Sequence, residues 1–382
     1  MLTRKRTIIM YKTGLVKNLK LFARNLELKY GATDVKILPL INGISCFIPE
    51  KLSFSVLDAD ADQEIEKILD DIIISLQKPY EESETKLRSL GIPSQGWVSG
   101  KQVIPQGIER IGANTVWNIS TGKAVKVAVL DTGIEVGHPD LQDNLVRGIN
   151  LINPYIVPND DNGHGTHIAG IIGAINDRLG VVGVAPKASL YPVKVLDYKG
   201  NATLSNLLEG LQWCIDNRVQ VINMSLGTSE HNDILLKAIK SVYNAGIVMV
   251  AATGNNGSQK YIDYPAAYAE TIAVGAITVN DTPAWYSNSN KRVNLMAPGD
   301  RVLSTYKNGS YGSLSGTSMA AAHVSGVVAL MLQIDSKLSP FQLTNILANS
   351  AEKLRYLTEE KHGSGLVRAD KTIERVKRKE FS

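Results

Sequence analysis

The sequence predicts an α/β protein with a doubly wound, mostly parallel sheet, preceded by a small N-terminal α+β unit. Short apolar runs between residues 125 and 275 are typical of buried strands, and helical patterns lie between them. Before residue 80 the elements follow a different order, without that regular alternation. The 382 residues suit one large and one smaller domain, because single cores rarely exceed about 250–300 residues.

The N-terminal unit is predicted to follow the order β-α-β-β-α. Residues 7–12 are predicted as a strand, and residues 15–30 as a helix because apolar side chains recur at helical spacing. Residues 34–48 form a predicted strand pair, with Asn42-Gly43 as its turn. Residues 59–77 are predicted as a second helix with isoleucine and leucine on its apolar face.

The large domain is predicted from strands that alternate with helices. Its predicted strands are residues 125–130, 188–195, 219–224, 246–252 and 271–275. Helices are predicted at 203–217 and 232–245, and crossovers through such helices make neighbouring strands parallel. We therefore assign the domains as residues 1–80 for the N-terminal unit, 81–101 for a linker and 102–382 for the large domain.

Charge and composition limit the partners of the protein. Its 41 basic and 37 acidic residues give a net charge of +4, which is too balanced for nucleic acid or an anionic membrane surface. No run reaches the roughly 18 apolar residues that a membrane span needs. We expect a monomer without nucleic-acid or membrane partners.

The cysteines and the first residues bear on the compartment. Cys46 and Cys214 lie far apart in the chain, so we predict two buried free thiols rather than a disulfide. The N-terminal segment lacks the long apolar run and small-residue cleavage site of an export signal. This favours a cytoplasmic protein, with secretion as the alternative.

Three polar residues occupy positions where chemistry is expected. Asp131 directly follows a predicted strand, His164 lies between glycines at a helix start, and Ser318 begins an apolar helix. In open α/β sheets, ligands bind beyond the carboxyl ends of the strands. Each residue also has a structural interpretation, as a turn or helix cap or as a hydrogen-bonded core histidine. His164 and His167 do not indicate zinc, because neither His-Glu-x-x-His nor a nearby cysteine accompanies them.

The residues around these three positions resemble the subtilase family of serine proteases. The matching motifs are Asp131-Thr-Gly-Ile, His164-Gly-Thr-His and Gly316-Thr-Ser-Met-Ala, in the family's order Asp, His, Ser. The resemblance runs from about residue 102 to about 332. It implies a serine endopeptidase that acts on polypeptides through an acyl-enzyme: Ser318 as nucleophile, His164 as base and Asp131 as the residue that orients the imidazole.

The resemblance also implies a substrate cleft. Asn255 matches the asparagine that stabilises the oxyanion, together with the backbone N–H of Ser318. Ser225, Leu226 and Gly227 match the edge segment that pairs with extended substrate, and Gly254 matches the pocket for the P1 side chain. Asp263 falls at the bottom of that pocket, where many relatives have glycine. A carboxylate there predicts a preference for Lys or Arg at P1, and the alternative is an exposed loop aspartate.

A structural calcium ion is also implied by the resemblance. Calcium binds six to eight oxygen ligands, which two carboxylates, an amide oxygen and backbone carbonyls can supply. The matching positions are Gln102, Asp140, Ile175, Asp177, Leu179 and Val181.

The N-terminal unit resembles the family's pro-domain, in element order and in Asn42-Gly-Ile-Ser-Cys-Phe-Ile-Pro. Such a domain assists folding and acts as an intramolecular inhibitor until the enzyme removes it. Alignment of Gln102 with the start of the mature family members predicts processing near Gly100 and Lys101.

One departure from the family keeps alternatives open. The family has proline four residues after the nucleophile, and here Ala322 takes its place, which leaves open whether water or an amine is the better acyl acceptor. A catalytically silent or self-inhibited binding scaffold, and a peptide ligase or esterase, remain the alternatives. An α/β-hydrolase is disfavoured because Gly-x-Ser-x-Gly is absent from the sequence.

Overall fold

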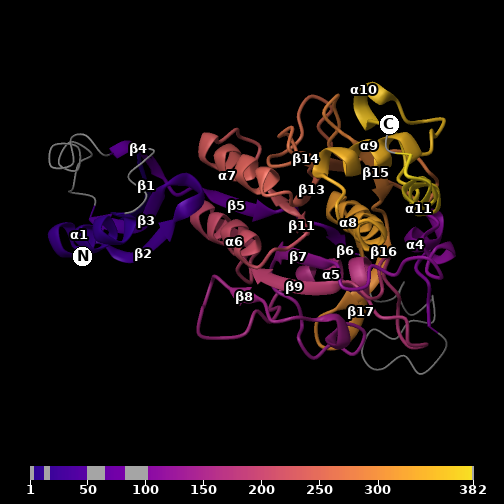
Figure 1. The fold of residues 1–382 in the computed structure, drawn as a ribbon, viewed down its shortest axis with the longest axis horizontal. Helices are drawn as coiled ribbons and strands as arrows, with labels where there is room; N and C mark the ends of the chain where they lie inside the picture. Colours follow the sequence, from indigo (N-terminus) through magenta and orange to yellow (C-terminus); the bar gives the residue numbers. More distant parts are fainter. Residues whose placement is uncertain (1–3, 13–17, 50–64, 82–101, 381–382) are drawn as a thin grey trace.

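The computed structural model describes residues 4–12, 18–49, 65–81 and 102–380 (Figure 1). A seven-stranded sheet with the order β15-β14-β13-β11-β7-β9-β8 lies at the centre of the large domain, and every strand pair in it is parallel. The prediction of a doubly wound parallel sheet is confirmed, and its five predicted strands are β7, β9, β11, β13 and β14. The strands of this sheet are β7 (Lys126–Asp131), β8 (Ile149–Asn150), β9 (Ser189–Lys194), β11 (Val221–Met224), β13 (Val248–Ala252), β14 (Thr271–Ile277) and β15 (Leu295–Pro298).

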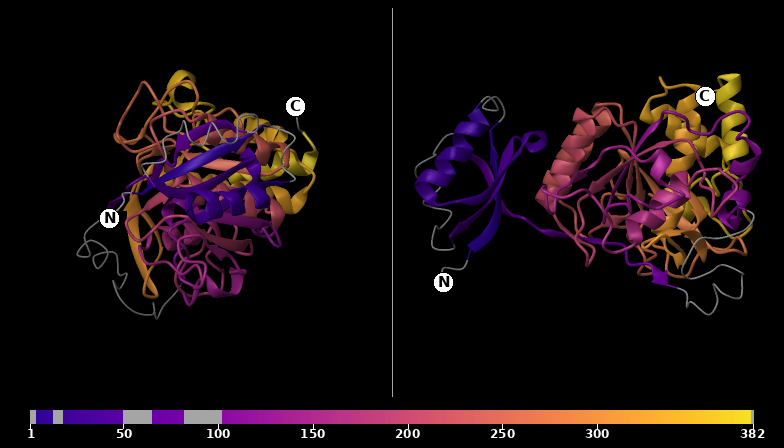
Figure 2. Two further views of the ribbon diagram at one scale, coloured as in Figure 1. Left: turned by 90° about the vertical axis from the view of Figure 1, so that its left-hand side faces the viewer. Right: turned by 90° about the horizontal axis from the view of Figure 1, so that it is seen from below.

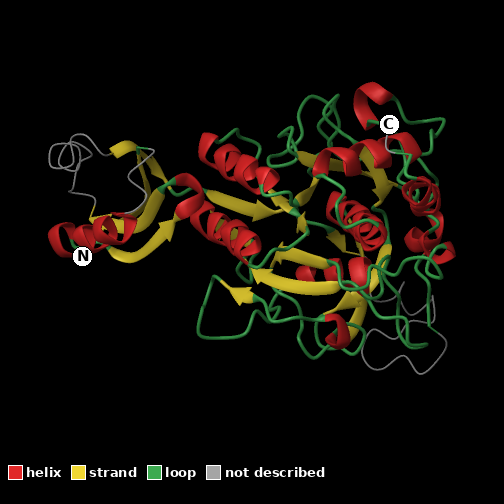
Figure 3. Ribbon diagram, viewed as in Figure 1, coloured by secondary structure: helices red, strands yellow, loops and turns green. Residues whose placement is uncertain are grey.

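Helices cover both faces of this sheet (Figure 2). Figure 3 shows the helices around the strands; the two predicted helices are α6 (Leu204–Asp216) and α7 (Asp233–Asn244). The other helices are α4 (Gln106–Arg110), α5 (His164–Gly173), α8 (Thr317–Ile334), α9 (Pro340–Ser350), α10 (Glu359–His362) and α11 (Ala369–Arg378), with 3₁₀ turns at Pro39–Ile41, Ala113–Thr115 and Gln142–Asn144.

Helix α8 is the one helix of the described residues that is long and apolar enough to cross a membrane. It is buried over 89% of its length and packs on α5 and on strands of the central sheet. Its apolar character is therefore that of a core helix.

In its described residues, the N-terminal unit consists of a four-stranded antiparallel sheet and one helix. Its elements are β1 (Arg4–Tyr11), α1 (Leu19–Tyr30), β2 (Thr33–Leu38), β3 (Gly43–Pro49) and β4 (Ile65–Asp70), with the sheet order β2-β3-β1-β4. Side chains alternate along β1, because successive residues of a strand point to opposite faces. Ile9 and Tyr11 join a small core with α1, whereas Ile8 and Met10 join the core of the large domain. The sheet thus packs between its own helix and the large domain.

The predicted helix at residues 59–77 is wrong over its described part. Residues 65–70 form β4, and residues 73–76 form β5 (Ile73–Leu76). Isoleucine at helical spacing also suits a strand, since its β-branched side chain packs well on a sheet. Strand pairing decides between a helix and a strand here. Ile68 lies opposite Ile9 of β1, and β5 is flanked by strands of the large domain.

The segment after β4 enters the large domain. β5 lies between β10 (Asn201–Thr203) and β12 (Leu226–Gly227) in an antiparallel three-stranded sheet. A few residues later, β6 (Tyr80–Glu81) pairs with β17 (Ser310–Ser315), whose other neighbour is β16 (Val302–Tyr306). The rest of the predicted linker, residues 82–101, lies outside the described residues, and so do Gly100 and Lys101.

The cysteines lie apart in the structure as well. Cys46 is buried in the N-terminal unit and Cys214 in the large domain, and both are free. Burial raises the pKa of the Cys46 thiol to about 12 and raises that of Cys214 too. Both are therefore neutral, unreactive thiols near pH 7.

Candidate active site

The three candidate relay residues come from three elements that end or begin at one edge of the sheet. Asp131 is the last residue of β7, His164 is the first residue of α5, and Ser318 is the second residue of α8. All three are buried. The carboxyl ends of parallel strands and the helix starts beyond them share this edge, so residues distant in sequence meet there.

Asp131 and His164 are in direct contact. Nδ1 of His164 lies 2.8 Å and 3.0 Å from the two carboxylate oxygens of Asp131. The backbone N–H of Thr132 donates to Asp131 Oδ1 at 2.8 Å and fixes the carboxylate from the other side. A carboxylate is an acceptor, so Nδ1 carries the proton and Nε2 of the neutral ring is left as the basic atom.

Asp160 is a residue that the sequence analysis missed. Its Oδ1 accepts hydrogen bonds from Thr132 Oγ1 at 2.8 Å and Gly163 N at 2.9 Å. Its Oδ2 accepts from the N–H and Oγ1 of Thr166 at 2.9 Å and 2.7 Å. One buried carboxylate therefore caps the start of α5 and joins it to the turn after β7. A carboxylate just before a helix is an N-terminal cap signal, and Asp160-Asp-Asn-Gly could have revealed it.

Glycine at position 165 makes this close approach sterically possible. A Cβ atom on Gly165 would lie 2.0 Å from the carbonyl oxygen of Gly133, far inside van der Waals contact. The glycines around His164 thus let the helix start rest against the turn that follows Asp131.

Ser318 lies at the start of α8, a helix that packs against α5. Its Oγ and the Nε2 of His164 are buried and have no hydrogen-bond partner among the described residues. These are the two atoms between which a proton would pass. Ala322 is fully buried one turn further along α8. A pocket of about 210 Å³ beside His164 is lined by Leu76, Lys78, Pro79, Asn162, His164, Lys199, Tyr306 and Leu314, so the chain's own segment covers the site.

Asn255 points its amide nitrogen into the cleft. Its Oδ1 accepts hydrogen bonds from the backbone N–H and Oγ1 of Thr317 at 2.9 Å and 2.8 Å. Its Nδ2 donates to the carbonyl oxygens of Gln77 and Lys78, each at 3.3 Å. A side-chain donor held in this way can stabilise negative charge on a carbonyl oxygen of a bound peptide.

The predicted substrate-pairing segment, residues 225–227, is paired with an extended part of the chain itself. The backbone N–H of Gln77 donates to the carbonyl oxygen of Ser225 at 3.2 Å. Leu226 pairs with Leu76, and Gly227 pairs with Ser75. The occupant is the chain itself, bound in the antiparallel register that a substrate would use.

Asp263 is a buried residue rather than the exposed loop aspartate of the alternative interpretation. Its Oδ2 accepts a hydrogen bond from Nε2 of Gln77 at 2.6 Å, and its Oδ1 has no partner among the described residues. Gly254 adjoins this carboxylate, and a Cβ on it would lie 2.7 Å from Asp263 Oδ2. Burial raises the pKa of Asp263, and the hydrogen bond from Gln77 opposes that rise.

The predicted calcium ligands meet around one loop. Nε2 of Gln102 donates to three carbonyl oxygens, those of Ile175 at 2.7 Å, Leu179 at 2.9 Å and Val181 at 3.2 Å. Three carbonyls directed at one atom form a site for a cation or a donor. The amide of Gln102 can present either its nitrogen or its oxygen there.

The two carboxylates of the predicted calcium set adjoin this loop. Asp140 accepts from the N–H of Val181 at 2.8 Å, and Asp177 accepts from the N–H of Leu179 at 2.9 Å. Burial raises the pKa of Asp140 to about 6, and a hydrogen bond from Tyr311 opposes this. Such an all-oxygen donor set fits a hard cation such as calcium.

His167 is a structural residue. Its Nε2 donates to the carbonyls of Val302 at 3.0 Å and Gly312 at 3.1 Å. Burial and the nearby His164 lower the pKa of His167 to about 3, so it is neutral near pH 7. Its ring is held between α5 and the β16–β17 hairpin, which agrees with the absence of a zinc motif.

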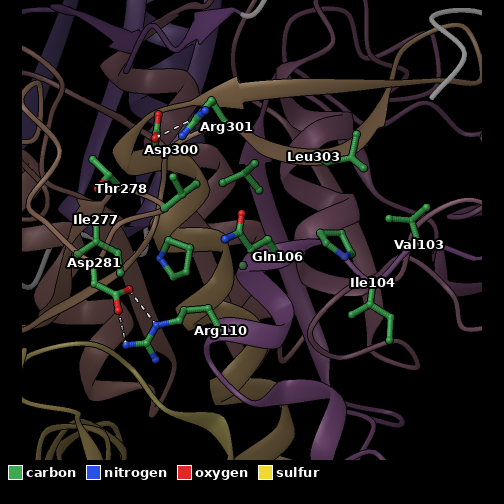
Figure 4. A pocket seen from close by; sticks show the side chains of 15 residues that line it. Val103, Ile104, Gln106, Arg110, Ile277, Thr278, Asp281, Asp300, Arg301 and Leu303 are labelled. Carbon is green, nitrogen blue, oxygen red and sulfur yellow. Dashed lines mark hydrogen bonds and ion pairs between the residues drawn. The ribbon is translucent and has the colours of Figure 1, made fainter. Parts of the chain in front are cut away.

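A separate pocket of about 300 Å³ lies between α4, β16 and the end of β14. Figure 4 shows Arg110 at its edge, with its guanidinium directed at the carboxylate of Asp281. Arg110 also pairs with Glu352, and its hydrogen bond to Asp281 is the main cause that raises its pKa. The pocket shares no residue with the predicted catalytic set, so we interpret its ion pairs as structural.

Comparisons with known proteins match this chain to subtilases. The model of the subtilase family matches residues 122–368. Subtilisin BL of Lederbergia lenta is 44% identical over 270 residues, which cover 70% of this chain and 98% of that protein. M-protease of Shouchella clausii is 44% identical over 270 residues, 70% of each chain. An intracellular serine protease of Paenibacillus polymyxa is 42% identical over 254 residues, 64% of this chain and 78% of that protein.

Proposed function

This chain belongs to the subtilase family and is a serine-type endopeptidase, and we propose that Asp131, His164 and Ser318 are its charge relay. The observation that carries the assignment is the cleft itself. A peptide segment of the chain lies across these residues, with its backbone paired to Ser225 and a carbonyl oxygen on Asn255. This is the geometry expected of a bound substrate.

The reaction follows from the atoms that meet there. Ser318 Oγ attacks the carbonyl carbon of the bound peptide while its proton moves to Nε2 of His164. Asp131, held against Nδ1 at 2.8 Å, stabilises the imidazolium that forms. Asn255 Nδ2 donates to the developing oxyanion. His164 then returns the proton to the leaving amine, and water releases the acyl group by the same route in reverse.

Asp263 is proposed to set selectivity at P1. Its carboxylate is buried and already accepts a side-chain N–H from the residue in the pocket. A Lys or Arg side chain would replace this neutral contact by a charge-assisted hydrogen bond, which is roughly twice as strong. We therefore propose a preference for P1 side chains that donate hydrogen bonds, with Lys and Arg first.

The N-terminal unit is proposed to act as an intramolecular inhibitor. Its Asp71 side chain is fully buried, and its two oxygens accept from the N–H of Ser205 at 2.9 Å and from Arg6 Nε at 2.8 Å. Lys36 adds an ion pair with Glu209 at 2.7 Å. The unit is thus fixed at the start of α6 while its continuation fills the cleft. Polypeptide substrates can enter only after the unit leaves.

Calcium is proposed to stabilise the processed enzyme through the loop of Ile175, Leu179 and Val181 with Gln102, Asp140 and Asp177. Support comes from the three carbonyls that converge on the Gln102 amide. Ligand at 100 times its Kd contributes about 2.7 kcal/mol to the free energy of unfolding. Excess EGTA should lower the Tm of processed enzyme by several degrees, and added calcium should restore it. An unchanged Tm would contradict the site.

Substitution of Ser318 separates hydrolysis from mere binding. Ser318→Ala should lower kcat about 10⁶-fold, a loss measured on subtilisin, which belongs to the same family. Casein hydrolysis and labelling by a fluorophosphonate probe report it, and the folded variant should still melt cooperatively. An unlabelled wild-type protein would favour a silent binding scaffold, and peptide joining in the presence of an amine would favour a ligase.

A monomeric, cytoplasmic enzyme is also part of the proposal. One relative is named an intracellular serine protease, which supports the compartment. N-terminal sequencing of the active protein from each cell fraction, with its mass in solution, tests both points.

A further inference from the structure

One segment of the chain, residues 76–79, lies against residues of the proposed site. The residue at P1 is the one whose N–H bonds to Ser225 and whose carbonyl bonds to Asn255. Gln77 makes both contacts, at 3.2 Å and 3.3 Å. The carbonyl of Lys78 also accepts from Asn255 at 3.3 Å, so the bond from the Gln77 N–H to Ser225 is the contact that sets the register. The bond that follows its carbonyl joins Gln77 to Lys78.

The side chain of Gln77 supports the same register. It is buried and donates to Asp263 at 2.6 Å, so the amide sits at the bottom of the P1 pocket. A shift by one residue along the cleft would place Leu76 or Lys78 there. In the observed register Leu76 is instead buried beside Gly200, and Lys78 is exposed.

The chain is also bound beyond this bond. A Cβ atom on Gly316 would lie 3.7 Å from Cα of Pro79, so the segment passes directly over the start of α8. The next two residues form β6 on β17. The peptide therefore spans the cleft on both sides of the nucleophile, as the substrate of an endopeptidase must.

We propose that the first processing event is cleavage of the chain's own bond between Gln77 and Lys78. The inference rests on the proposed relay. Ser318 Oγ bonds to the carbonyl carbon of Gln77, its proton passes through His164 to the nitrogen of Lys78, and the C–N bond breaks. Water then hydrolyses the acyl group, so that residue 77 ends in a carboxylate and Ser318 regains its hydroxyl. Residues 78–101 stay attached to the large domain.

This position differs from the sequence-based expectation at Gly100 and Lys101. That expectation came from aligning Gln102 with the start of mature relatives. The contacts of Gln77 place the first cut 23 residues earlier. A later cut nearer to residue 100 is compatible with this first one.

The test is to follow processing of the full chain with time. Samples of freshly refolded protein are taken at intervals and quenched in acid. Intact-mass measurement and N-terminal sequencing then identify the earliest fragments. We expect a fragment that ends at Gln77 and a partner that begins at Lys78, with neither formed by Ser318→Ala. An earliest new N-terminus at any other residue, Lys101 included, would overturn the proposal.

A negative charge introduced next to Asp263 tests the proposal by a second measurement, besides the mapping of fragments. Gln77→Glu should slow the cut about 10²-fold, because like charges repel strongly in a desolvated contact. Combining it with Asp263→Asn should restore most of the rate, whereas Gln77→Met, which removes only the donor, should slow the cut about tenfold. Melting of the same variants in the Ser318→Ala background shows that they fold. A cut indifferent to Gln77→Glu would reject the proposal.

The experiments distinguish failure of this proposal from failure of the proposed function. A chain that hydrolyses peptides but first cuts itself elsewhere rejects the Gln77 site alone. A chain that neither hydrolyses peptides nor reacts with the fluorophosphonate probe rejects both.

Discussion

Two buried aspartates of the proposed site have opposite surroundings. Asp131 accepts a backbone N–H on one oxygen and has both oxygens within 3.0 Å of His164 Nδ1. Asp263 has one contact, from the side chain that occupies the pocket, and a second oxygen without a partner among the described residues. The relay carboxylate is satisfied by the fold, whereas the pocket carboxylate depends on its occupant.

Under the proposed function, this difference separates the group that supports the reaction from the group that selects the substrate. A carboxylate fixed by the protein stabilises the imidazolium whatever peptide is bound, so it contributes to every turnover. A carboxylate that lacks protein partners carries a desolvation cost which only a donating P1 side chain relieves. Asp131 should therefore affect kcat for all substrates, and Asp263 should affect the ratio between substrates.

Asp131→Asn should have the largest effect. The amide keeps the shape but supplies no negative charge, and it can hold the wrong tautomer of His164. Loss of the corresponding aspartate in subtilisin, a relative, lowers kcat about 3 × 10⁴-fold. We expect a similar loss here for P1 Lys and P1 Leu peptides alike, measured as kcat on processed enzyme. A loss confined to P1 Lys peptides would break the distinction.

Asp263→Asn should have a smaller and selective effect. Without the charge, kcat/KM for P1 Lys and Arg peptides should fall about 10–100-fold, the range of a hydrogen bond between charged groups. Peptides with P1 Leu or Phe should keep or gain activity, because a buried charge is removed. The measurement is kcat/KM for a series that differs only at P1. Wild-type enzyme with equal activity on Lys, Phe and Leu peptides would exclude the proposed preference.

The pH dependence of that ratio should show the smallest effect. Burial raises the pKa of Asp263, so the carboxylate becomes neutral at a higher pH than an exposed aspartate does. The preference for Lys over Leu should be full above the raised pKa and should decline as pH falls through it. Groups that act on the reaction itself affect both peptides equally, so their effect cancels in the ratio. Asp263→Asn supplies the control and should show a ratio independent of pH.

Much of the fold could be predicted from the sequence. Buried parallel strands are continuous apolar runs with helices between them, and β7, β9, β11, β13 and β14 all have this character. The elements before residue 80 are harder to predict, because β4 and β5 are strands only through their pairing with other strands. Residues 73–76 become a strand only because β10 and β12 flank them, a contact across well over one hundred residues that local periodicity does not contain.

The candidate site likewise contains residues that sequence motifs reveal and residues that only the structure reveals. Asp131, His164, Ser318 and Asn255 lie in short motifs, so their positions could be named before their contacts were known. The role of Gln77 could not, since it depends on where side chains meet in space, whereas Asp160 lies in a helix-capping pattern that the sequence does contain. Gln77 in particular has no motif, and only its contacts with Ser225, Asn255 and Asp263 mark it out.

The short pairing of β6 with β17 has a consequence for the kinetics of processing. After a cut ahead of residue 78, the new amine is still tethered to the cleft by this pairing and by the covalent chain. An amine held there has a high effective concentration toward the acyl group, compared with a free peptide. It should therefore compete with water and re-form the bond many times before the strand detaches. The slow event in maturation would then be departure of the leaving strand rather than bond breakage itself.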